Sequence, residues 1–181
     1  MTPDAAKLMA EYNRWMNRRM YEAAASLPEA EVKRDRGAFF GSILETLNHI
    51  LVADAIWLHR FARQPDAAEL RAGLAGWPLP TSLRQEMAES LPALARRRHE
   101  LDELVVRWAG ALTTERLAAP LAYRNMAGQP WNRTLGHLVL HFFNHQTHHR
   151  GQASTLLFQA GVDIGVTDLL AVIPEDRKSV V

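Results

Sequence analysis

The sequence predicts an all-α protein, a four-helix bundle with a small irregular or hairpin segment before the last long helix. Four long segments carry apolar residues three and four apart, and short stretches rich in proline and glycine separate them. A chain of 181 residues can enclose one substantial core, and it contains no internal repeat. We therefore expect a single domain over 1–181, with the bundle at about 3–161 and a tail at 162–181.

The first two helices are marked by a cap and by apolar periodicity. Thr2 offers a capping hydroxyl, Pro3 suits the first helical position, and Pro28 ends the apolar pattern. A second helix is expected from about Phe39 to Ala62, apolar on most of its circumference. Such a helix is normally buried by several neighbours, and its all-round apolar surface is also why we expect a homodimer.

The third helix follows a connecting loop. Residues 64–80 hold three prolines and two glycines, which is typical of a loop. Helical periodicity then runs over about 82–112. Pro92 lies inside that range, so either the helix kinks there or Ser90 caps a fresh start.

The last third of the chain changes its pattern twice. Residues 117–131 lack a helical period and can form a small hairpin. The fourth helix is expected to begin near Asn132, a good cap, and to end at Gly161. A short apolar piece, 169–173, lies in the tail.

Composition excludes several kinds of function. A formal charge of +1 gives no general case for nucleic acid or an anionic membrane as partner. The chain has no cysteine, which excludes disulfides, thiolate ligands and a cysteine nucleophile. No apolar run approaches the roughly 20 residues that span a bilayer, and the first residues lack the basic and apolar regions expected of a signal peptide. We expect a cytoplasmic protein without nucleic-acid or membrane partners.

A dense histidine run is the main candidate for chemistry. The segment from His141 to Gln152 holds four of the eight histidines, and His137 lies just upstream. Imidazole is the commonest metal ligand among side chains and titrates near neutral pH. The run alternates with apolar residues, unlike a contiguous terminal tag. It therefore indicates a metal site or a proton-handling site, with a solvated helix face as the alternative.

Helical geometry divides this run. At about 100° per residue, His149 lies roughly 40° and His145 roughly 80° from the centre of the apolar stripe. His137, His141 and His148 lie further round, roughly 120° to 160° away, toward solvent. Two imidazoles four residues apart can converge on one ion. A third ligand must come from another helix, and the candidates are His49, His59 and His99.

Other polar residues allow two interpretations each. Asn13 and Asn17 can bind a ligand or connect helices, and Arg150 can clamp an acidic substrate or form a structural salt bridge. The run Arg96–Arg98 is interpreted as a solvated face. Gly151, which costs about 1 kcal/mol in mid-helix relative to Ala, is expected at a close helix crossing.

The run Asn-His-Gln-Thr-His-His-Arg-Gly-Gln, residues 144–152, resembles the signature of the DinB/YfiT-like proteins, bacterial four-helix bundles with a metal site. Tyr-Asn-Arg-Trp-Met-Asn, residues 12–17, is similar to that family's first helix. Leu-Asn-His-Ile-Leu, residues 47–51, followed by Trp57, is similar to its second. The similarity covers nearly the whole chain in the same order.

This resemblance implies a triad of metal ligands, His49, His145 and His149, for a divalent ion. Zinc or nickel is expected first, with iron or cobalt as alternatives. On the helical wheel His49 lies opposite several leucines, so the residues alone leave His59 open as the third ligand.

The resemblance also implies an activity. Family members include thiol S-transferases and an isomerase that use low-molecular-weight thiols. We expect a metal-dependent hydrolase or a thiol-dependent S-transferase acting on a small molecule, with His148 or His141 supporting the metal ligands or transferring protons. The alternatives are a non-catalytic, stress-associated dimeric bundle that binds metal, and a bundle without metal. An exchangeable ligand on the metal distinguishes the first interpretation from the second.

Overall fold

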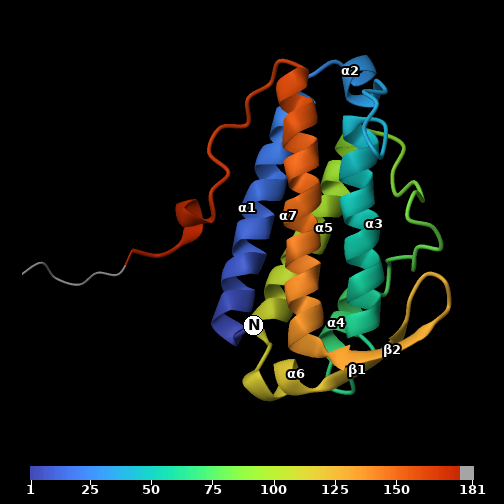
Figure 1. Cartoon of the computed structure of the whole chain (residues 1–181), viewed down its shortest axis with the longest axis vertical. Coiled ribbons are helices and arrows are strands. Elements are labelled where there is room, and N and C mark those ends of the chain that lie inside the picture. Colours follow the sequence, from blue (N-terminus) through green and yellow to red (C-terminus); the bar gives the residue numbers. More distant parts are fainter. Residues whose placement is uncertain (176–181) are drawn as a thin grey trace, which may run out of the picture.

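The computed structural model describes residues 1–175; residues 176–181, which belong to the predicted tail, lie outside the described residues. Four long helices pack side by side (Figure 1), which confirms the predicted all-α four-helix bundle. The long helices are α1 (Pro3–Ala25), α3 (Ile43–Phe61), α5 (Leu91–Gly110) and α7 (Leu135–Gln159). The short elements are α2 (Glu29–Lys33), α4 (Ala68–Gly73), α6 (Thr114–Ala118), β1 (Pro120–Arg124), β2 (Pro130–Thr134) and the 3₁₀ helix η1 (Leu169–Val172).

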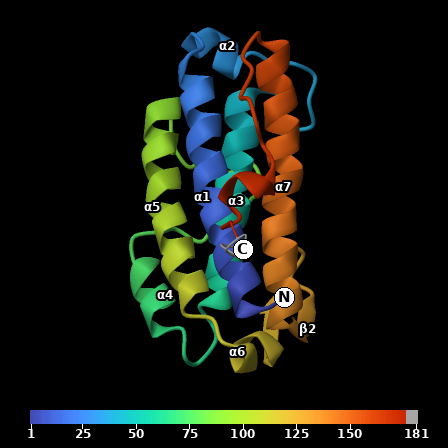
Figure 2. The same ribbon diagram turned by 90° about the vertical axis from the view of Figure 1, so that its left-hand side faces the viewer.

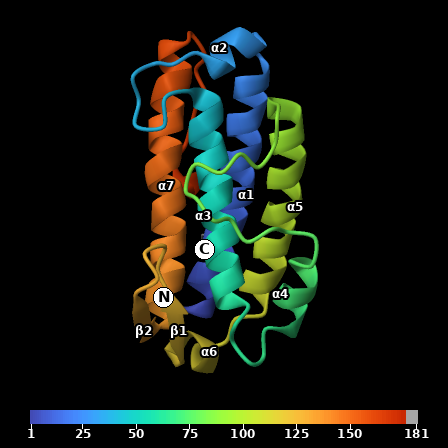
Figure 3. The same ribbon diagram turned by 90° about the vertical axis from the view of Figure 1, so that its right-hand side faces the viewer.

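The order of the helices creates the seam that matters for function. Helix α1 packs against α5 and α7, and α3 packs against α7. Figure 2 shows α5 beside α1, with the tail running over the α1 side of α7. Figure 3 shows α7 and α3 side by side. In that view the loop between α2 and α3 lies at one end of the seam and the hairpin at the other.

Local capping explains where two helices begin. Ser42 and Glu45 form a capping box: the Glu45 backbone N–H donates to Ser42 Oγ at 3.1 Å, and the Ser42 N–H donates to Glu45 Oε2 at 3.0 Å. Helix α3 therefore begins at Ile43, and the predicted start at Phe39 is wrong. Ser90 caps α5, so the fresh start is the correct alternative for Pro92.

The hairpin overrides a second predicted boundary. Asn132 does not cap α7, because it pairs with Ala122 in an antiparallel ladder that keeps the backbone extended to Thr134. The predicted hairpin itself is confirmed. At the other end, Gly161 has φ +86°, a conformation that favours glycine, and the predicted helix stop is correct.

Helix α3 is buried along nearly its whole length. Its apolar residues belong to one core cluster with side chains of α1, α5 and α7. The chain itself therefore covers the apolar circumference that suggested a homodimer. Among the described residues, no helix is both long and apolar enough to cross a membrane.

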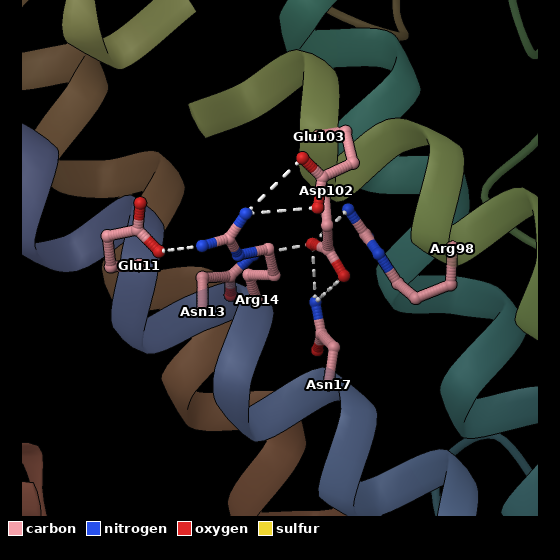
Figure 4. A network of polar contacts seen from close by, with 7 residues as sticks. All are labelled: Glu11, Asn13, Arg14, Asn17, Arg98, Asp102 and Glu103. Atoms are coloured by element: carbon pink, nitrogen blue, oxygen red, sulfur yellow. Dashed lines mark hydrogen bonds and ion pairs between the residues drawn. The ribbon is translucent and has the colours of Figure 1, made fainter. Parts of the chain in front are cut away.

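A polar network lies inside this core. Arg98 on α5 is 2% exposed, so its assignment to a solvated face is wrong. Its guanidinium contacts Asp54 of α3 at 2.5 Å and Asp102 of α5 at 2.9 Å. Figure 4 shows Asp102 also accepting from two α1 side chains, Asn17 at 2.9 Å and Asn13 at 3.3 Å. The two asparagines therefore connect helices.

The two remaining assignments on α7 also change. Arg150 is buried and donates to Asn13 Oδ1 and Thr147 Oγ1, and none of the described carboxylates lies within ion-pair distance of it. It is therefore a third connection to α1 instead of a salt bridge. No described atom outside its own helix lies within 4 Å of a Cβ built on Gly151, so the predicted close crossing is wrong.

We expect Arg98→Met to lower the free energy of unfolding by about 3–5 kcal/mol, because it leaves two carboxylates buried without their cation. Urea denaturation at pH 7 measures this loss. Arg96→Met is the matched control, since Arg96 is exposed on the same helix. A loss below about 1 kcal/mol for Arg98→Met, similar to a surface substitution, would contradict the role of the network.

Candidate metal centre

Three histidines meet across the seam between α3 and α7. His145 and His149 lie one helical step apart on α7, and their Nε2 atoms are 3.1 Å from each other. The ring of His49 on α3 has its centroid 4.6 Å from that of His149 and 5.3 Å from that of His145. One nitrogen from each ring lies within 4.8 Å of the other two. The structure thus brings together the three histidines that the family resemblance implied.

The other histidines lie outside this cluster. His145 and His149 are half-buried, whereas His137, His141 and His148 are exposed, as the helical wheel predicted. His59 contacts the carbonyl of Trp77 through Nε2 at 3.2 Å, and His99 is exposed on α5. Neither joins the pair on α7. His49 is 4% exposed because α3 is buried on two faces, which the wheel could not distinguish.

Hydrogen bonds fix which nitrogen of each ring carries a lone pair. His149 Nδ1–H donates to Gln152 Oε1 at 2.7 Å, and His49 Nδ1–H donates to the Leu83 carbonyl at 3.1 Å. Both acceptors lack a proton, so each neutral ring keeps its lone pair on Nε2. Metal-binding histidines in proteins are usually oriented by this kind of bond. Neither partner was predicted from the sequence. Gln152 could have been, because it lies three residues after His149 and therefore one helical turn away. A backbone carbonyl leaves no trace in the sequence.

Phe40 covers the cluster from the loop before α3. Its ring stacks on His49 with centroids 3.8 Å apart and meets His149 edge-on at 5.5 Å. The guanidinium of Arg84 lies 5.3 Å from the same ring. Because the helix was predicted to start at about Phe39, Phe40 was predicted as a helical residue and not as part of the site. The Ser42–Glu45 capping box would have placed it in the loop.

The surroundings hold all three rings neutral. Burial, together with neighbouring imidazoles, lowers the pKa of His49 to about 4 and that of His145 to about 3, and for His49 the bond to the Leu83 carbonyl opposes this shift. Burial also lowers the pKa of His149, against the opposing effect of its bond to Gln152. Neutral imidazole is the form that binds metal, so the lone pairs are available at pH 7.

The donor set fits a divalent ion with open positions. Nitrogens bonded at about 2.0–2.1 Å to a tetrahedral ion are about 3.3 Å apart, close to the 3.1 Å between His145 and His149. Among the described residues, no carboxylate belongs to this group. Three neutral ligands leave the charge of the ion uncompensated and leave room for water or substrate. The cluster can therefore hold a metal ion of the catalytic type.

Two exposed histidines border the cluster. The His148 ring centroid is 4.8 Å from that of His149, and Gln152 Nε2 lies 3.4 Å from His148 Nε2. The His141 ring centroid is 6.0 Å from that of His145. Their expected part in proton transfer stays a prediction.

The low pKa of His49 predicts a pH-dependent contribution to stability in the metal-free protein. The unfolded chain binds a proton near pH 6.5 and the folded chain only near pH 4, so the contribution is complete above pH 6.5 and is lost as the pH falls to 4. Between pH 7 and pH 4 we expect the native protein to lose about 2–3 kcal/mol more of its free energy of unfolding than the His49→Gln variant loses. Denaturation with chelator present measures it, and a pH-independent difference would contradict it.

Comparison with known proteins agrees with the geometry. The model of the DinB family matches residues 1–177. Protein DinB of Bacillus subtilis (strain 168) is 26% identical over 170 residues, which cover 91% of each chain. The match includes both helices that supply the three histidines. The chain belongs to the DinB family.

Proposed function

We propose that the protein binds a divalent metal ion through His49, His145 and His149 and uses it in a reaction on a small molecule. The observation that carries this proposal is the convergence of three neutral imidazoles, two of them oriented by Nδ1–H donation. A divalent ion with such ligands supplies Lewis acidity, which lowers the pKa of a bound water or thiol. Zinc or nickel is our first expectation, because imidazole suits both.

The reaction we favour is S-transfer with a low-molecular-weight thiol as cosubstrate. The chain has no cysteine, so a sulfur nucleophile has to come from outside. Phe40 shields one side of His49, while His141 and His148 lie on the exposed side, where an imidazole can take up a proton. Metal-dependent hydrolysis, with water as the nucleophile, uses the same ligands.

The homodimer and the cytoplasmic location expected from the sequence remain predictions. Because the chain itself covers α3, we propose α7 as the source of exposed apolar residues for the homodimer interface. On α7, Leu140 is 53% exposed and Phe158 is 69% exposed.

Elemental analysis of untagged protein tests the ligand set. We expect a stoichiometric divalent ion in the native protein and its loss in His49→Ala, His145→Ala and His149→Ala, because each variant removes one of three ligands. His141→Ala is the matched control, since it removes a neighbouring imidazole that is not a ligand. Metal absent from the native protein would favour a bundle without a metal site, and metal retained in all three ligand variants would mean that the ion binds elsewhere.

Ligand exchange tests whether the bound ion is catalytic. In cobalt-substituted protein, we expect 2-mercaptoethanol to produce a sulfur-to-cobalt charge-transfer absorption, because three histidines leave a position open to the thiol. The His149→Ala variant serves as the control for cobalt bound elsewhere. A spectrum that the thiol does not change would support the non-catalytic, stress-associated alternative.

A further inference from the structure

A second feature of the α3 face is a cleft at the hairpin end of the bundle. Its volume is about 460 Å³.

 This volume falls in the range of small-molecule sites, about 300–1,000 Å³. Figures 1 and 3 show the hairpin at the same end of the bundle as the C-terminal end of α3. The lining comes from α3 and the residues after it, from the loop after α4 and from the hairpin turn: Ile56, His59, Arg60, Arg63, Leu79, Pro80, Thr81, Arg124, Asn125, Met126 and Gly128.

The charge of this lining has one sign. It contains three arginines and a histidine, and no carboxylate. Within residues 1–175, Arg60, Arg63 and Arg124 form no ion pair. Other arginines, such as Arg36 and Arg116, contact acidic side chains. The cleft therefore concentrates positive charge that the described part of the chain does not neutralise.

Arg60 is the cation of this lining that packs against two aromatic rings. Its guanidinium lies 4.5 Å from the ring centroid of Trp57 and 5.1 Å from that of Tyr123. The side chain is half-buried, and burial lowers its pKa. A partly desolvated cation without an anion is unfavourable, so an anionic ligand would gain more here than at an exposed arginine.

The cleft continues the face of α3 that carries the metal centre. Ile56 follows His49 by seven residues, which places the two within about 20° on the helix and about 10 Å apart along its axis. His141 bridges the two regions from α7, with ring centroids 6.0 Å from His145 and 5.1 Å from Trp57. A single extended small molecule can therefore reach both.

We propose that this cleft binds the anionic end of the substrate of the metal centre. The substrate class is a small organic carboxylate or phosphate whose reacting group lies about 10–17 Å from the anion, because Ile56 and Arg60 follow His49 by seven and eleven residues at about 1.5 Å each. Arg60, Arg63 and Arg124 contact the anion, and Ile56, Leu79 and Met126 contact an apolar segment. This assignment of substrate rests on the proposed function.

Calorimetric titration of metal-free protein tests the cleft separately from the metal. The probes are hexyl phosphate, hexanoate and the neutral hexanol. We expect both anions to bind at least about tenfold more tightly than hexanol, because only the anions accept charge-assisted hydrogen bonds from the arginines. The tighter anion identifies the charged group of the substrate.

Substitutions locate the binding. We expect Arg60→Gln to weaken anion binding about tenfold, and the double variant Arg63→Gln with Arg124→Gln to do the same. Arg63 and Arg124 are exposed, so the double variant keeps the test valid if Arg60→Gln fails to fold. Arg96→Gln, exposed on α5, is the matched control.

Three results would overturn the assignment: equal binding of hexanol, anion binding unchanged in the cleft variants, or arginine-dependent binding of a duplex oligonucleotide in place of the small anions. Metal content is measured on each protein as purified, before the metal is removed for calorimetry. Loss of the proposed function appears as absent metal with anion binding intact, whereas failure of the cleft leaves metal content unchanged.

Discussion

The pairing of buried charges at the centre of the bundle is the constraint on which the rest of the structure depends. Arg98 joins α5 to Asp54 of α3, Asp102 accepts from α1, and Arg150 of α7 donates to Asn13. Arg98 needs both aspartates beside it, and the side chains of α1 and α7 need their hydrogen-bond partners, because a buried charge or polar group without a partner costs up to several kcal/mol. All four helices therefore have to keep one mutual register.

That register also sets the metal centre. Asp54 lies five residues after His49 on α3, and Arg150 directly follows His149 on α7. The same two helices that the network fixes therefore present their histidines to each other across the seam. Helix α7 serves both roles because its inward side chains enter the network while His145 and His149, at the edge of that face, reach the seam. The positions of the three histidines are therefore fixed by the polar network and the core, and not by contacts among the histidines themselves.

Part of this arrangement could be predicted from the sequence, because it depends on local periodicity. Apolar spacing predicted the four helices, and the wheel separated His145 and His149 from the exposed histidines. His49 needed the family resemblance, since a helix buried on two faces gives the wheel no preferred direction. The start predicted at Asn132 was wrong because strand pairing competed with capping.

Other parts depend on contacts between distant segments and leave little local signal. Arg98 belongs to a run of arginines, and only the packing of α3 on α5 distinguishes it from Arg96, which is exposed, and Arg97, which is half-buried. Phe40 and the Leu83 carbonyl reach the histidines from loops whose paths are set by tertiary structure. That the described residues lining the cleft beside Arg60 include no carboxylate likewise becomes visible only when the hairpin is placed beside α3.

The central claim is that three imidazoles from two helices hold one ion and leave it an open position. X-ray absorption spectroscopy of the zinc-loaded protein tests it most directly. The account predicts three imidazole nitrogens at about 2.0–2.1 Å together with an oxygen from water. Fewer than three imidazoles, or a fourth ligand from the protein that closes the site, would contradict it.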